Sequence, residues 1–219
     1  MAWEPAHAVR KLKTTGEHPV WLVHRPGEQP RTLKAWSVTP LRLLTLVLGA
    51  AQPQRQIAGA GRLHRAGIRT PVMDGGWRFA RRDRAVIELE YVYVEGRSAL
   101  DMARDDTLAP ADVRRVSGAI GDVAAAMVTA GLVNRDFKLA NLIVSETGDV
   151  WLIDTVAIRA DRSSRSVARM LERLAVQLPV MESRLSPAAW FPALRRAMRA
   201  IPARRRREVV RWLRAHRQR

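Results

Sequence analysis

The sequence of 219 residues contains no cysteine, and this absence excludes a disulfide framework, a thiolate zinc site and a cysteine nucleophile. It also contains no long hydrophobic run, because the most apolar stretch, Leu41 to Ala51, is interrupted by Arg42 and is too short to span a bilayer. The first residues lack the apolar segment of a signal peptide. We therefore expect a cytoplasmic protein that is soluble or peripheral to a membrane.

Lysine is scarce throughout the chain, and acidic residues are scarce near its end. Residues 159–219 carry 17 arginines against four acidic residues, a net charge of +13, whereas the first 158 residues carry only +4. Hydrophobic residues make up 47% of the chain and can fill the core of one domain, which excludes wholesale disorder. With 34 arginines but only four lysines, each lysine is a candidate for a specific role: Lys11, Lys13, Lys34 and Lys138.

Strand signals dominate the first part of the chain. Short β-type runs separated by turns rich in proline, glycine or charge predict strands over 20–24, 32–36, 77–80 and 85–94. Between the two predicted hairpins, apolar residues at helical spacing predict a helix over 54–66. We expect a small β-rich unit, an N-lobe, over residues 1–95.

Helical patterns dominate the rest of the chain, which we expect to form a helical C-lobe over residues 96–219. A long helix is predicted over 113–130, with a start signal at Pro110 and Asp112, and a β-hairpin over 142–144 and 150–153 follows it. Later helix signals are the helix-opening prolines Pro187 and Pro202 and an apolar stripe of Val167, Met170, Leu171, Leu174 and Leu178. The predicted fold class is α+β.

Polar residues lie directly before and after the hairpin predicted over 142–153, in the segment Asn134-Arg-Asp-Phe-Lys-Leu-Ala-Asn141 and at Asp154. Phosphoryl transfer needs a carboxylate for the proton of the attacking hydroxyl, and an amide and a second carboxylate to hold Mg²⁺ against the phosphates. A lysine beside the first carboxylate can neutralise charge on the transferring group. Asp136, Asn141, Asp154 and Lys138 supply these groups, although Asp and Asn near turns are also common caps and turn formers.

This segment resembles the catalytic loop and the metal-binding Asp of the protein-kinase-like superfamily. The compact layout, with Gly67-Ile-Arg-Thr-Pro71 after the first helix, resembles the bacterial lipopolysaccharide kinase family, the Kdo and heptose kinases of the lipid A core. The resemblance runs from about Val20 to Leu178 and is specific between Leu132 and Asp154. It implies a compact bilobal fold and transfer of phosphate from ATP, with Mg²⁺, to a hydroxyl of a sugar or glycolipid.

The resemblance also implies roles for individual residues. Asp136 takes the place of the catalytic base, Lys138 that of the phosphate-contacting lysine, and Asn141 and Asp154 those of the two metal ligands. Lys34 resembles the strand lysine that binds the nucleotide phosphates, and its alternative is a solvated strand lysine. Glu90 to Val94 resembles the hinge between the lobes, so backbone groups of Glu90 and Val92 are expected to meet the adenine of ATP.

Several positions depart from the family pattern. Asn134 replaces the usual histidine, Thr155-Val156 replaces Phe-Gly, and Gly16 is the single glycine where a glycine-rich phosphate loop is expected. Gln56 stands where a glutamate would pair with Lys34, and a glutamine can accept a hydrogen bond from the ammonium without neutralising its charge. These departures keep an alternative open, a non-catalytic pseudokinase that binds or scaffolds.

The short segment after Asp154 indicates which class of acceptor the protein would phosphorylate. Only about a dozen residues separate Asp154 from the predicted helix near Ser166, and no Ala-Pro-Glu occurs there. Protein kinases build their peptide platform from an extended activation segment, so its absence favours a small or lipid-linked sugar acceptor.

The arginine-rich C-terminus has two alternative interpretations. Helical spacing from Pro202 places Val209, Trp212, Leu213 and His216 on one side and most arginines on the other. Such a helix can lie on an anionic membrane at the inner face of the cytoplasmic membrane, or it can dock on the protein and expose its arginines. Docking is favoured, and nucleic acid is the least favoured partner because aromatic residues are not interleaved with the basic ones.

Overall fold

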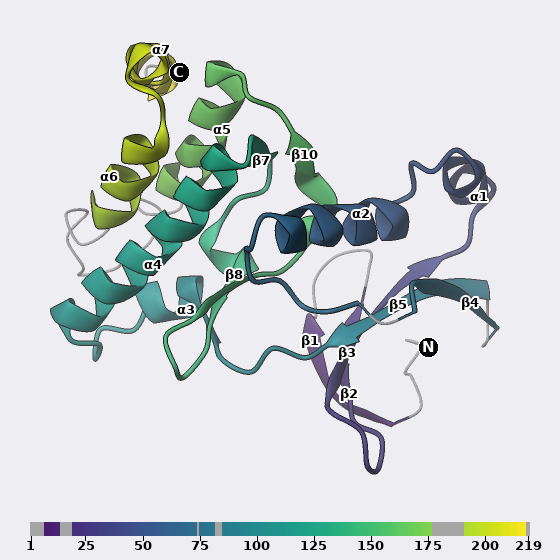
Figure 1. The fold of residues 1–219 in the computed structure, drawn as a ribbon. Coiled ribbons are helices and arrows are strands. Elements are labelled where there is room, and N and C mark those ends of the chain that lie inside the picture. The colour runs from purple at the N-terminus through teal and green to yellow at the C-terminus, as the bar shows by residue number, and fades with distance from the viewer. Residues whose placement is uncertain (1–6, 14–18, 74, 82–84, 177–190, 218–219) are drawn as a thin grey trace.

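The structure is a computed structural model that describes residues 7–13, 19–73, 75–81, 85–176 and 191–217. Its largest sheet has five antiparallel strands in the order β1-β2-β3-β5-β4 (Figure 1). The strands are β1 (Ala8–Lys13), β2 (Val20–Val23), β3 (Arg31–Ser37), β4 (Trp77–Arg81) and β5 (Ala85–Val92). Both predicted hairpins are confirmed, β5 ends two residues earlier than expected, and β1 was not predicted.

The two faces of this sheet carry different side chains. In the pairing of β3 with β5, Lys34 lies opposite Leu89 and residue 32 lies opposite Tyr91, so these residues share one face. Trp36, Leu89 and Tyr91 pack there with Ile57. The opposite face buries a second apolar cluster made of Trp21, Val23, Leu33 and Ala35. The register therefore turns Lys34 toward the helix that carries Ile57.

That helix is α2 (Gln52–Arg65), which confirms the helix predicted over 54–66 and ends before Gly67, whose φ is +69°. It lies between the sheet and the helical part of the chain (Figure 1). Its residues contact both sides, because Ile57 packs on the sheet cluster while Leu63 belongs to the main core. A shorter helix that the sequence pattern did not predict, α1 (Pro40–Val47), precedes it.

The helical part contains the main core, which is built around α4 (Pro110–Thr129). This confirms the long predicted helix and the start signal at Pro110, which opens it. Helix α6 (Phe191–Ala200) packs closely on α4. A Cβ at Gly121 would lie 2.8 Å from the Ala193 backbone, so only glycine allows this approach.

Three short strand pairs and turns join these helices. β6 (Arg97–Ser98), β8 (Leu142–Val144) and β9 (Val150–Leu152) form one small sheet, and β7 (Leu132–Asn134) pairs with β10 (Ile158–Ala160). The predicted hairpin is therefore confirmed as β8 and β9. The same region contains the short helix α3 (Ala99–Ala103) and the 3₁₀ turns η1 (Leu139–Asn141) and η2 (Thr155–Ala157).

The chain ends in two packed basic helices, α5 (Ser164–Val176) and α7 (Ala203–Arg217). The predicted stripe is buried at Val167, Met170, Leu171 and Leu174, whereas Leu178 and the helix start expected at Pro187 lie outside the described residues. On α7, Val209 is fully buried, Trp212 and Leu213 pack against the core, and the Arg165 guanidinium lies over the Trp212 ring. The apolar side of α7 is thus docked on the protein.

The fold class is mixed α and β, with a small antiparallel sheet followed by helices. None of the helices in the described ranges is both long enough and apolar enough to cross a membrane.

Candidate functional site

The loop between β7 and η1 holds Asp136 by several hydrogen bonds. The backbone N–H of Asp136 donates to Asn134 Oδ1 at 2.8 Å. The Asn141 Nδ2 amide donates both to Asp136 Oδ2 and to the Asp136 carbonyl oxygen, at 3.0 Å each. The Lys138 ammonium lies 2.9 Å from Asp136 Oδ2. The structure therefore brings Asp136, Lys138 and Asn141 together as predicted, and Asn134, which is fully buried, positions the loop.

Asp154 follows β9 with a left-handed backbone, φ +53° and ψ +74°. This conformation costs a non-glycine residue about 1 kcal/mol, and such strain concentrates at functional sites. Asp154 Oδ1 lies 3.4 Å from Lys34 Nζ. The same ammonium donates to Gln56 Oε1 at 3.3 Å. The Lys34 side chain is only 12% exposed, which contradicts the alternative of a solvated strand lysine.

Helix α2 is held tightly against the turn that contains Asp154. The Thr155 hydroxyl donates to the Gln56 carbonyl oxygen at 2.5 Å. A Cβ at Gly59 would lie 2.0 Å from the Thr155 carbonyl oxygen, so the helix can approach this closely only because residue 59 is glycine. The helix that carries Gln56 and the turn after Asp154 therefore behave as one packed unit.

The loop of Asp136 and the strand end at Asp154 meet through Asn141. The Ile153 N–H, directly before Asp154, donates to the Asn141 carbonyl oxygen at 2.9 Å. Asn141 thus bonds to Asp136 through its side chain and to the neighbour of Asp154 through its backbone. Residues distant in the sequence form one connected site: Lys34, Gln56, Asp136, Lys138, Asn141 and Asp154.

Tyr91, which lies within the segment expected to form the hinge, is a further member of this site. Its ring is buried, and a side-chain hydrogen bond joins it to Gln56. Burial and the nearby Asp154 carboxylate raise the pKa of the Tyr91 hydroxyl, which therefore stays protonated. The signal for this residue is the register of β3 and β5, which places Tyr91 on the face of Lys34.

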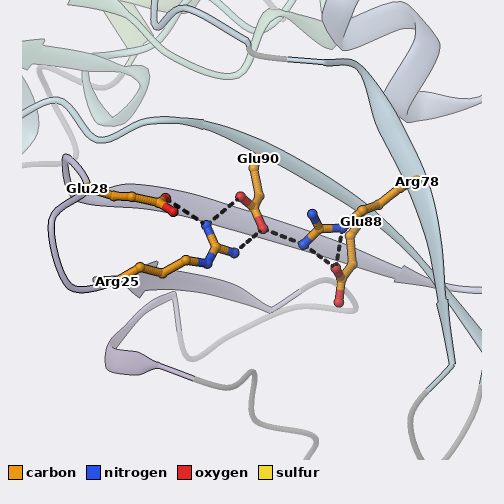
Figure 2. Close-up of polar contacts among 5 residues, drawn as sticks. All are labelled: Arg25, Glu28, Arg78, Glu88 and Glu90. Carbon is orange, nitrogen blue, oxygen red and sulfur yellow. Dashed lines mark hydrogen bonds and ion pairs between the residues drawn. The ribbon is translucent and has the colours of Figure 1, made fainter.

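Glu90 and Val92 are predicted to meet adenine through their backbone groups. The Glu90 carboxylate lies in a polar network with Arg25, Glu28, Arg78 and Glu88, and its Oε1 oxygen accepts from Arg25 Nη2 at 2.7 Å and from Arg78 Nη2 at 2.6 Å (Figure 2). Strand alternation points it away from the face that carries Lys34 and Tyr91. The Val92 N–H donates to the Val72 carbonyl oxygen at 3.0 Å, so it is engaged within the protein. The Glu90 side chain therefore lies outside the connected site, and the contact of the backbone with adenine stays a prediction.

The donor set at the connected site fits a magnesium ion that also contacts phosphate. Because Asn141 uses its Nδ2 group toward Asp136, its Oδ1 oxygen is the atom left for a cation. Asp154 adds a carboxylate that is 36% exposed. In the described ranges, no three His, Asp or Glu side chains gather as in an all-protein metal centre. Mg²⁺ is commonly bound by one or two protein carboxylates together with phosphates and water, which agrees with this sparse set.

Comparisons with known proteins add no family assignment. No protein-family model matches the chain. A search of curated proteins also gives no match.

Proposed function

We propose that this protein is an ATP-dependent phosphotransferase with a bilobal protein-kinase-like fold, related to the lipopolysaccharide kinases. The observation that carries the proposal is the convergence of Lys34, Asp136, Asn141 and Asp154, which come from three separate parts of the chain, in one hydrogen-bonded site. The arrangement of a β-rich part and a helical part with α2 between them supports the fold (Figure 1). The strained backbone of Asp154 supports a functional role for that carboxylate.

Each residue has a defined task in this mechanism. Asp136 accepts the proton of the acceptor hydroxyl, and the Asn141 amide and the Lys138 ammonium hold its carboxylate in place. Lys34 neutralises phosphate charge of ATP. Asn141 Oδ1 and Asp154 are the groups that would hold Mg²⁺, which when bound supplies charge neutralisation between the phosphates.

The acceptor is proposed to be a hydroxyl of a sugar or glycolipid. Only η2 and β10 lie between Asp154 and the start of α5, which leaves no extended segment on which to bind a peptide. Helix α1 exposes several large apolar side chains, with Leu41 71%, Leu44 56% and Val47 85% exposed. Together with the arginines exposed on α7, this apolar helix supports contact with an anionic membrane that carries the acceptor. Sedimentation with vesicles of anionic and of neutral lipid tests that contact, and equal recovery of the protein from both would contradict it.

The proposed activity is tested by nucleotide binding and turnover of purified protein. In the presence of Mg²⁺, ATP is expected to raise the melting temperature, and ADP is expected to form when the correct acceptor is present. Asp136→Ala should lower turnover by about 10²–10⁴-fold while ATP binding persists, because a general base contributes that much to the rate. Asp106→Ala, at an exposed aspartate outside the site, is the matched control. An Asp136→Ala variant with unchanged turnover would remove the assignment.

The alternative is a pseudokinase that binds nucleotide without transfer. One observation favours it, because Gln56 accepts a hydrogen bond from Lys34 where a glutamate would also neutralise the charge. Binding of ATP and Mg²⁺ without ADP formation on any sugar or glycolipid acceptor would decide for this alternative.

A further inference from the structure

A basic cavity of about 500 Å³ lies beside the loop that carries Asp136. Its volume is within the range of about 300–1,000 Å³ that small-molecule sites occupy. Its wall is formed by β7, the following residue Arg135, β10 and α5, and neither Lys34 nor Asp154 lines it. It is therefore a separate feature from the connected site described above, although Arg135 and Asp136 are adjacent in the chain.

Four arginines from three parts of the chain converge on this cavity: Arg135, Arg159, Arg169 and Arg173. Glu172 is the acidic residue in the same wall. Arg159 is held by Asp161 at 2.9 Å and by the Ser166 hydroxyl at 3.0 Å. Within the described ranges, neither Arg135, Arg169 nor Arg173 forms an ion pair with an acidic side chain. The wall thus concentrates positive charge that the described protein does not neutralise.

Two details distinguish this cluster from arginines scattered on a surface. Arg169 and Arg173 are four residues apart on α5, and like charges at this spacing destabilise a helix unless something neutralises them. Asn134, fully buried, also lines the cavity, and its Nδ2 atom has no hydrogen-bond partner among the described residues. Its Oδ1 atom accepts the Asp136 N–H, which fixes the orientation of the amide group. The guanidinium groups of this wall, which lack acidic partners among the described residues at Arg135, Arg169 and Arg173, are suited to an oxyanion.

We propose that this cavity binds the phosphate group of a phosphorylated sugar or sugar lipid. Arginine guanidinium groups match the geometry of phosphate and bind it through paired N–H donors. The arginines of the cavity wall are by themselves the argument for binding of a phosphate group. The statement that this phosphate belongs to the acceptor rests on the proposed function. In that role, the site anchors one end of the acceptor next to the loop of Asp136 and thereby orients a hydroxyl of the same molecule.

Titration calorimetry with inorganic phosphate, hexose 6-phosphate and unmodified hexose tests the proposal on the full chain. Saturating Mg·ATP is included so that the nucleotide site is filled. We expect one phosphate-dependent site, weakened about tenfold by Arg169→Gln or Arg173→Gln because each removes charged hydrogen bonds. Glu172→Gln should tighten binding, because it removes the opposing charge. Arg195→Gln, at an exposed arginine of α6 outside the cavity, is the matched control and should change nothing.

The outcomes separate this proposal from the proposed function. Absence of phosphate binding, or equal effects of the Arg169 and Arg195 variants, would overturn the anion site whatever ATP does. Inorganic phosphate binding more tightly than hexose 6-phosphate would make this a site for free phosphate and overturn its role in the acceptor. Phosphate binding with the expected pattern, in a protein that does not bind ATP, would support the site and remove the kinase assignment. Circular dichroism of each variant verifies that it is folded.

Discussion

Replacing Asp154 by glycine separates a functional carboxylate from a structural one. The left-handed backbone at this position costs an aspartate about 1 kcal/mol, and glycine adopts it without that cost. Against this gain stands the loss of the ion pair with Lys34, which is worth about 0.5–1 kcal/mol because the carboxylate is 36% exposed and partly screened by water. The two terms nearly cancel. We therefore expect the free energy of unfolding of Asp154→Gly to lie within about 0.5 kcal/mol of the wild-type value.

The assay is thermal unfolding with and without ATP and Mg²⁺. In a protein of this size, 1 kcal/mol corresponds to about 2–4 °C, so the melting temperature without ligand should change by less than about 2 °C. The rise caused by Mg²⁺ and ATP should disappear, because Asp154 is one of the proposed metal ligands. Asp106→Gly, at an exposed residue whose backbone φ is negative, is the control and should keep that rise. A loss of more than about 2 kcal/mol in Asp154→Gly, or an intact response to ATP, would refute the reasoning.

Three further predictions concern the surroundings of the site. Gly59→Ala should lower stability by about 1–2 kcal/mol and weaken nucleotide binding, since its Cβ would lie 2.0 Å from the Thr155 carbonyl oxygen. Gly61→Ala is the control on the same helix, because its Cβ would lie 3.6 Å from its nearest neighbour, Arg65 Nη1. This control should be neutral or stabilising in thermal unfolding. Arg25→Gln should lower the free energy of unfolding at neutral pH and make its decrease in acid smaller, as measured by urea unfolding from neutral pH to below the ordinary carboxylate pKa. Burial opposes the Glu90 charge, but the hydrogen bond from Arg25 and the charge of Arg78 outweigh it and lower the pKa of Glu90. The stability that this lowered pKa provides is present above the ordinary carboxylate pKa and is lost as the pH falls through the lowered value. A variant with the same pH profile as the wild type would contradict the assignment. Gln56→Glu should tighten Mg²⁺ binding in calorimetry by adding a carboxylate beside Lys34 and Asp154, whereas Gln52→Glu, one turn earlier on α2, should not.

Local patterns explain which elements could be predicted. The strands β2 to β5 and the helices α2 and α4 carry their own periodicity, turn residues and helix-opening prolines, so their short-range signals suffice. Helix α1 was not predicted, because its nearly continuous leucines lack the polar positions that mark a helical face. Strands β1 and β10 were also not predicted. Each is short and carries basic residues, and each is defined by its partner strand rather than by its own sequence.

The residues of the connected site also divide into those that a local sequence pattern predicts and those that it does not. Asp136, Lys138 and Asn141 lie within six residues, so their proximity follows from one loop, and the structure brings them together. Glu90 and Tyr91 are neighbours in β5, and only the register with Lys34 decides which of them faces the site. A shift of one residue exchanges the two faces of a strand, so the resemblance to a hinge, which selected Glu90 and Val92 for their backbone groups, gives no information about which side chains of β5 face Lys34. The cavity lined by arginines depends on the approach of α5 to β7 and β10, which no local pattern contains.

The contacts of Lys34 show how the departure at Gln56 affects the proposed chemistry. With a glutamine on α2, Asp154 is the carboxylate that neutralises the Lys34 ammonium, and it is also a proposed ligand of Mg²⁺. A cation that recruits Asp154 must therefore compete with Lys34 for its oxygens. Phosphate groups of ATP resolve this competition, because they offer Lys34 new negative partners at the same time as they bring Mg²⁺. The metal and the nucleotide should consequently bind together, and Mg²⁺ alone should bind much more weakly than it does in the presence of ATP.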